Sequence, residues 1–192
     1  NAFATEGEKF NYLIICPGDY LGSFDPDSKT GVSAIDLAGE LWTMGHELGH
    51  HIDSEIFPTS YAKLESCVAD NYVDQLGQLD DQGQREQLKK EDVPRYMREI
   101  SADYWGTEAL ADVVKSVKNP GAKLYVLQDS LESLCKTPDD GRETGHPDGR
   151  FRIENFVRRN PRLSAAVGCD LNSSRETKPS CTLRGAWHKK FW

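Results

Sequence analysis

The segment His46-Glu47-Leu48-Gly49-His50 constrains the fold of this chain more than any other feature of its sequence. It lies in a stretch with a helical pattern, and an α-helix places side chains four residues apart on one face. Two imidazoles at that spacing can bind one metal ion, which zinc accepts in a tetrahedral shell. Glu47 lies beside them, where it can take a proton from water as a general base. The segment therefore predicts a helix that carries two zinc ligands, His46 and His50, and a base.

A catalytic zinc site takes more than two protein ligands, so a further donor must lie elsewhere in the chain. Glu99 and Asp103 are four residues apart on a helix that Pro94 is expected to open. We expect Glu99 to bind the ion and Asp103 to accept the second ring N–H of a histidine ligand, which fixes the orientation of that ring. Glu108 and Asp112 repeat the same spacing, so they form a competing pair.

The rest of the pattern indicates an α+β chain that is mostly helical. An apolar, β-rich run at 10–16 predicts a strand that stops at Pro17-Gly18. Helices are expected at 34–55, 61–79, 94–118, 120–135 and, more briefly, between 147 and 160. Pro58 is expected to end the first of them. Large apolar residues recur in that helix at spacings of three and four, and we expect this stripe to face the core: Leu41, Met44, Leu48, Ile52 and Ile56.

The length of 192 residues fits one domain, which we place at 1–167, with a polar, cysteine-containing tail at 168–192. The net charge of -8 argues against nucleic acid or an anionic membrane as a partner. We expect no membrane span, because no apolar run approaches the roughly 20 residues that cross a bilayer. The chain opens at Asn1 rather than Met, which indicates a processed or trimmed polypeptide.

Five cysteines occur, and none belongs to a CxxC pair that would indicate a zinc ribbon: Cys16, Cys67, Cys135, Cys169 and Cys181. Cys169 and Cys181 bracket the polar tail, and a disulfide between them would order a segment with little core of its own. That interpretation favours an oxidising compartment, so a periplasmic or secreted protein. The alternative is five ordinary thiols, and an odd count leaves at least one of them unpaired within the chain.

Short motifs occur along the chain in one order: Asn1-Ala2-Phe3-Ala4, HELGH at 46–50, Arg98-Glu99-Ile100-Ser101-Ala102-Asp103, and His146-Pro147 followed by Arg152-Ile153. Together they resemble the catalytic domain of the M48 family of zinc metallopeptidases, which includes the CAAX prenyl proteases and soluble periplasmic quality-control proteases. The likeness spans about residues 1–160. It implies a zincin-like domain with a small β-sheet edge beside the active-site helix. Ser101 and the tail depart from the family pattern, which leaves the choice of substrate open.

The resemblance implies that His46, His50 and Glu99 bind one zinc ion and that Glu47 is the general base. The expected activity is that of an endopeptidase with a polypeptide substrate. The ion would lower the pKa of bound water and polarise the scissile carbonyl, while Glu47 accepts the proton and passes it to the leaving amine.

Further residues receive roles from the same resemblance. Asp103 would support the site from behind a histidine ligand, and Arg152 would brace it against a nearby carboxylate. His146 would reach the substrate carbonyl and steady the oxyanion that develops there. Asn1 and Ala2 would lie beside the cleft, near the substrate backbone. The strand at 10–16 could bind an extended substrate along its edge.

Two alternatives stay open. One is a zinc-containing peptide-binding or chaperone-like module that recognises chains without cutting them; a peptide-binding assay combined with a chelator-sensitive turnover assay separates it from a peptidase. The other is latency, in which a segment before Asn1 inhibits or anchors the protein until it is removed.

Overall fold

The computed structural model describes residues 2–6, 11–15, 36–52, 56–77, 84–136, 145–147, 149–157, 159–168 and 178–183. The chain is mostly helical over these ranges, as predicted. The described elements follow in the order β1 (Ala2–Glu6), β2 (Asn11–Ile15), α2 (Asp36–Gly49), α3 (Pro58–Asn71), α4 (Val73–Leu76), the 3₁₀ turn η1 (Lys90–Asp92), α5 (Pro94–Ser116), α6 (Pro120–Lys136), α7 (Gly149–Arg152), the π-helical η2 (Ile153–Val157) and α8 (Pro161–Val167).

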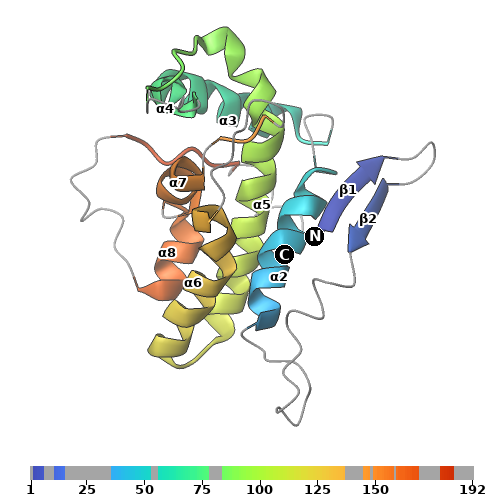
Figure 1. Ribbon diagram of the computed structural model, residues 1–192, viewed down its shortest axis with the longest axis vertical. Coiled ribbons are helices and arrows are strands. Elements are labelled where there is room, and N and C mark those ends of the chain that lie inside the picture. Colours follow the sequence, from blue (N-terminus) through green and yellow to red (C-terminus); the bar gives the residue numbers. More distant parts are fainter. Residues whose placement is uncertain are drawn as a thin grey trace.

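Helix α5 lies in the middle of the helical body and packs against α2, α6 and α8, and α6 also packs against α2 (Figure 1). Helices α3 and α4 lie across the end where α5 begins (Figure 1). The two strands form an antiparallel hairpin in which Ala2 faces Ile15 and Glu6 faces Asn11. Strand β1 contacts α2 (Figure 1). A helix that is surrounded in this way must bury side chains all round, and α5 does so from Tyr96 to Val114.

Four of the described helices begin with proline: Pro58, Pro94, Pro120 and Pro161. A proline fits the first helical position because its missing N–H would have no partner there, and its fixed φ is already helical. Asn119 accepts hydrogen bonds from the first amides of α6, and Asn160 does the same for α8. One sequence-based expectation is therefore wrong, because Pro58 opens α3 instead of ending the preceding helix. Asn160-Pro161 begins a helix, α8, for which there is no sequence-based prediction.

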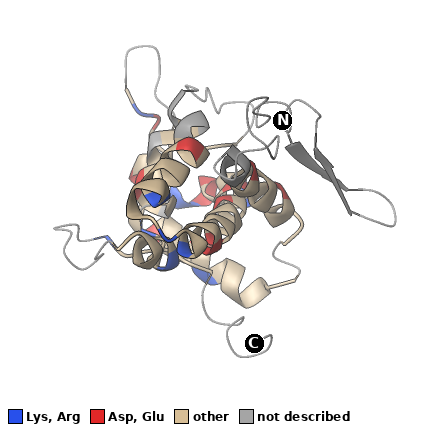
Figure 2. Cartoon of the chain, turned by 90° about the horizontal axis from the view of Figure 1, so that it is seen from below, with Lys and Arg blue, Asp and Glu red and all other residues tan. Residues whose placement is uncertain are grey.

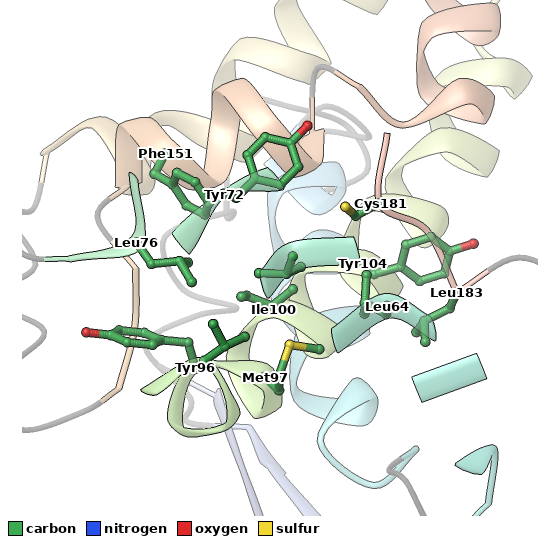
Figure 3. Close-up of a cluster of buried hydrophobic side chains, with 12 residues drawn as sticks. Leu64, Tyr72, Leu76, Tyr96, Met97, Ile100, Tyr104, Phe151, Cys181 and Leu183 are labelled. Atoms are coloured by element: carbon green, nitrogen blue, oxygen red, sulfur yellow. The ribbon is translucent and has the colours of Figure 1, made fainter. Parts of the chain in front are cut away.

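Two hydrophobic clusters meet along α5. The first joins α3, α4 and the start of α5 to the segment 178–183 (Figure 3). Its largest fully buried side chains are Tyr72, Tyr96, Leu64, Leu76, Met97 and Ile100. The second cluster joins α2, the end of α5, α6 and α8, and its members include Trp42, Leu110, Val114, Val126 and Leu163. The candidate site lies on α2 and α5; both clusters hold α5 in place, and the second also holds α2.

Helices α2 and α5 cross at close range through small residues. A Cβ added at Gly49 would lie 2.8 Å from the Cα of Ala102, and one added at Gly106 would lie 2.8 Å from the carbonyl oxygen of Trp42. The face of α2 that packs on the body therefore carries Trp42, His46 and Gly49, all of them buried. The predicted stripe is wrong, because Leu48 of that stripe remains 47% exposed. Backbone contact through glycine, and not the larger apolar side chains, determines the buried face.

A disulfide joins Cys67 of α3 to Cys181, over a sequence separation of 114. The predicted pairing of Cys169 with Cys181 is therefore wrong. Cys181 and Leu183 are buried in the first hydrophobic cluster, so this part of the tail contributes to the core. Further contacts hold the segment down: the hydroxyl of Tyr72 donates to the carbonyl of Pro179, and Lys178 pairs with Asp74.

Acidic and basic segments lie next to one another in the middle of the helical body (Figure 2). Their buried members are paired, since an ion without a partner is costly to remove from water. Asp103 pairs with Arg152, and Glu108 with Arg162. Within the described ranges, no helix is both long and apolar enough to cross a membrane.

Candidate metal centre

The last turn of α2 carries the two histidines. His46 is buried against α5. His50 follows the final helical residue and lies in a turn, in which its backbone N–H donates to the carbonyl oxygen of Glu47 at 3.2 Å. The helical repeat still brings the rings together, with centroids 4.8 Å apart and planes at 85°. The predicted same-face arrangement of His46 and His50 is thus present, although the helix is shorter than predicted and ends at Gly49.

Glu99 faces both imidazoles from the neighbouring helix. Its Oε2 lies 3.3 Å from Nε2 of His46, and its Oε1 lies 3.6 Å from Nε2 of His50. Glu108 is also buried, but it accepts hydrogen bonds from Asn160 at 2.8 Å and from Arg162 at 2.7 Å. Glu99 and Glu108 are the two candidates for the carboxylate ligand. Glu99 contacts the histidines, whereas Glu108 contacts the start of α8.

Asp103 supports His46 from behind. The Nδ1 of His46 donates to Oδ1 of Asp103 at 2.9 Å, which turns the Nε2 of the same ring toward Glu99. Arg152 holds the carboxylate of Asp103 with two hydrogen bonds, from Nε to Oδ2 at 2.8 Å and from Nη2 to Oδ1 at 2.6 Å. Burial raises the pKa of Asp103, but the charge and hydrogen bonds of Arg152 outweigh it and lower the pKa to about 2. The carboxylate therefore remains charged behind His46.

His146 reaches the same place from the segment before α7. Its Nε2 lies 2.6 Å from Oε2 of Glu99, and its ring stacks on that of His46 with centroids 6.4 Å apart. The preceding Gly145 has φ +71°, and a Cβ there would lie 2.9 Å from the carbonyl oxygen of Arg95. A glycine thus lets this segment approach the start of α5 closely enough for His146 to contact Glu99.

The electrostatics of the cluster suit a cation. Burial lowers the pKa of His46, but hydrogen bonds to Asp103 and Glu99 outweigh it and raise the pKa to about 9. Burial lowers the pKa of His50 to about 4. Burial raises the pKa of Glu99, but hydrogen bonds from His146 and His46 hold it well below its usual range. Positive charge is therefore favoured at His46, where a divalent cation can take the place of a proton, while His50 stays neutral, which is the form of imidazole that binds a metal ion.

Two sets of donor atoms lie close enough to share one ion. The first comprises His46, Glu47 and His50, the second His46, Glu99 and His146, and within each set the atoms lie within 4.8 Å of one another. Imidazole nitrogens and carboxylate oxygens are ligands that zinc accepts. These donors therefore fit zinc, and His146, which the sequence-based prediction assigns to the substrate carbonyl, also lies close enough to reach an ion.

An open cavity of about 380 Å³ adjoins these side chains. It is lined by His46, Glu47, His50, Arg95, Arg98, Glu99 and His146. The two arginines have no predicted role in the site. A sequence signal for Arg95 exists, because it precedes Glu99 by four residues and so shares its face of α5. Asn1 lies outside the described residues, and Ala2 begins β1.

Comparisons of the chain with protein-family models, with curated proteins and with solved structures found no match. A functional interpretation therefore depends on the chemistry of the site itself.

Proposed function

We propose that this chain is a zinc-dependent endopeptidase similar to the M48 family, with a zincin-like catalytic domain. One observation carries the proposal: His46 and His50 from α2 meet Glu99 from α5, and Glu47 lines the same cavity. Two histidines and a carboxylate are the zinc ligands of one class of peptidase, and the glutamate next to the first histidine is its general base.

In this proposal His46, His50 and Glu99 hold the ion. Bound zinc supplies a Lewis acid that activates water and polarises the substrate carbonyl. Glu47 accepts the proton of the attacking water and then donates it to the leaving amine. His146, which lines the cavity, donates a hydrogen bond to the carbonyl oxygen as its charge develops.

The surroundings support the same function. Asp103 and Arg152 keep His46 in the orientation that a ligand requires. The β1–β2 hairpin beside α2 offers an edge along which an extended polypeptide can bind. The Cys67–Cys181 disulfide favours an oxidising location, so we propose a periplasmic or secreted protein.

Metal analysis tests the ligand set. Purified wild-type protein should hold about one zinc ion per chain. The Glu99→Gln variant should lose most of that zinc, because it removes a charged ligand. Glu108→Gln is the matched control: it changes a buried glutamate on the same helix that contacts Arg162 instead of the histidines, so it should retain zinc. Equal zinc content in both variants would contradict the assignment of Glu99.

Peptide hydrolysis tests the proposed activity. The Glu47→Gln variant should keep its zinc and lose at least about a hundredfold in the rate of casein hydrolysis, because it lacks the general base. Wild-type rates in this variant would overturn the role of Glu47. Tight peptide binding without cleavage by the zinc-loaded wild type would instead favour a peptide-binding module.

A further inference from the structure

Two arginines share the cavity with the candidate metal centre. Arg95 and Arg98 lie near the start of α5, and both line the cavity together with Glu47, Glu99 and the histidines. Both are exposed residues, so their guanidinium groups can be reached from solvent. The proposed zinc chemistry uses neither of them, and their presence requires another explanation.

Arg95 is held in position yet available for exchange. Its guanidinium carbon lies 4.7 Å from the ring centroid of Tyr96, a residue that is fully buried. Such a cation–π contact restricts the arginine before any ligand arrives. Its ionic partner is Glu86 at 3.1 Å, and the two side chains are 48% and 46% exposed. Exposed ion pairs of this kind contribute little free energy, so another carboxylate can replace Glu86.

The local charge opposes the charge of the whole chain. The sequence contains 31 acidic and 23 basic residues, which should disfavour acidic ligands at long range. In the cavity, by contrast, the charge of Glu99 is engaged by histidines on three sides, and the rest of the lining holds two arginines, Arg95 and Arg98, against one carboxylate, that of Glu47. Arginine binds carboxylates through paired N–H donors, so a carboxylate is the group that this wall recognises.

We propose that Arg95 and Arg98 bind a carboxylate of the substrate next to the scissile bond and give the site a preference for acidic peptides. This inference rests on the proposed peptidase function and adds its substrate class. The carboxylate can belong to an Asp or Glu side chain or to the free C-terminus of the substrate, and both sources present the same group to the arginines.

The test uses the zinc-loaded full chain and quenched fluorescent peptides that carry Glu, Gln or Lys at each position flanking the cleaved bond. A second set compares free with amidated C-termini, which separates the two sources of the carboxylate. Wild-type protein should cleave the best Glu peptide, or the best free-acid peptide, about fivefold faster in kcat/KM than its neutral counterpart. The difference should shrink at high salt, which screens exposed charges.

Variants identify the residues responsible. Arg95→Gln and Arg98→Gln should each reduce the ratio of acidic to neutral cleavage, and Arg98→Glu should shift the preference toward the Lys peptide. Lys115→Gln removes an exposed cation from the other end of α5 and should leave the ratio unchanged. Cleavage with equal acidic and neutral rates, or a preference that survives both arginine substitutions, overturns this inference alone. No cleavage of any peptide overturns the proposed function and the inference with it.

Discussion

Asp103 determines which nitrogen of His46 can face the cavity. It accepts the Nδ1–H of that ring and is itself held by Arg152, so the imidazole cannot rotate without breaking a buried hydrogen bond to a fixed carboxylate. His50 has no comparable support, since its buried Nδ1 has no hydrogen-bond partner in the described part of the chain. The two proposed ligands are therefore unequal, and His46 is the one that is oriented in advance.

The Asp103→Asn variant tests this support. An amide retains one hydrogen bond to His46 but removes the charge that Arg152 requires, so zinc affinity should fall about 10- to 100-fold. Competition with a chromogenic chelator measures the affinity, and circular dichroism checks that the variant is folded.

Asp112→Asn is the matched control for that variant. Asp112 pairs with Arg162 and lies nine residues further along α5, roughly 14 Å away, so its substitution should not change zinc affinity. A folded Asp103→Asn variant with the affinity of the wild type would show that the carboxylate does not orient a ligand.

At the scale of elements, the crossing of α2 and α5 brings the histidines to Glu99. The helices approach closely because Gly49 and Gly106 leave room for the partner backbone. The large apolar residues of α2 misled the sequence-based prediction, because hydrophobic periodicity gives no weight to glycine. In a sequence, the only sign of a close helix crossing is the presence of small residues on two helices. Which two helices pack together depends on the fold, so the sequence alone does not identify the crossing.

The Gly106→Ala variant tests the crossing. Alanine favours a helix interior by up to about 1 kcal/mol over glycine. Here, however, the new Cβ would lie 2.8 Å from the carbonyl oxygen of Trp42, and backbone cannot move aside cheaply. We expect the free energy of unfolding in urea to fall by about 1–3 kcal/mol.

Gly121→Ala in the first turn of α6 provides the comparison for that substitution. Among the described residues, a Cβ there meets only the Asn119 side-chain oxygen, at 3.3 Å. Its stability should equal or slightly exceed that of the wild type. Equal stability in the Gly106 and Gly121 variants would mean that the helices do not depend on close contact.

Much of the site followed from local spacing, whereas the choice between equivalent candidates did not. The i, i+4 rule placed His46 with His50 and Glu99 with Asp103. Glu99 and Glu108 have the same spacing to their aspartates, and both are buried. Their partners differ. Glu108 accepts hydrogen bonds from Asn160 and Arg162, which lie at the start of the unpredicted helix α8.

At the scale of the whole molecule, the disulfide binds the end of the described chain to α3. It connects residues that are distant in sequence, and the segment around Cys181 adds Leu183 to the first hydrophobic cluster. Sequence alone suggested the near neighbour Cys169, since proximity along the chain is the only guide when the fold is unknown. The observed pairing depends on the packing of α3 against the segment 178–183, which no local pattern records.

Replacing both cysteines tests the contribution of this link. A closed loop of this length limits the unfolded chain, so Cys67→Ser with Cys181→Ser should lower the free energy of unfolding by about 2–5 kcal/mol. Urea unfolding with and without dithiothreitol measures it. Reductant should destabilise the wild type and leave the double variant unchanged; an equal loss in both would assign the effect to another cysteine pair.

The covalent link between Cys67 and Cys181 also changes what counts as an intact molecule in an assay. Glu99 and His146 lie inside the loop that it closes, whereas His46, Glu47 and His50 precede it. One broken peptide bond between the two cysteines leaves both fragments joined, and they migrate as a single species until the sulfur bridge is opened. A nick inside this loop would thus be visible only on reducing gels, and a preparation that looks homogeneous without reductant can already be a mixture.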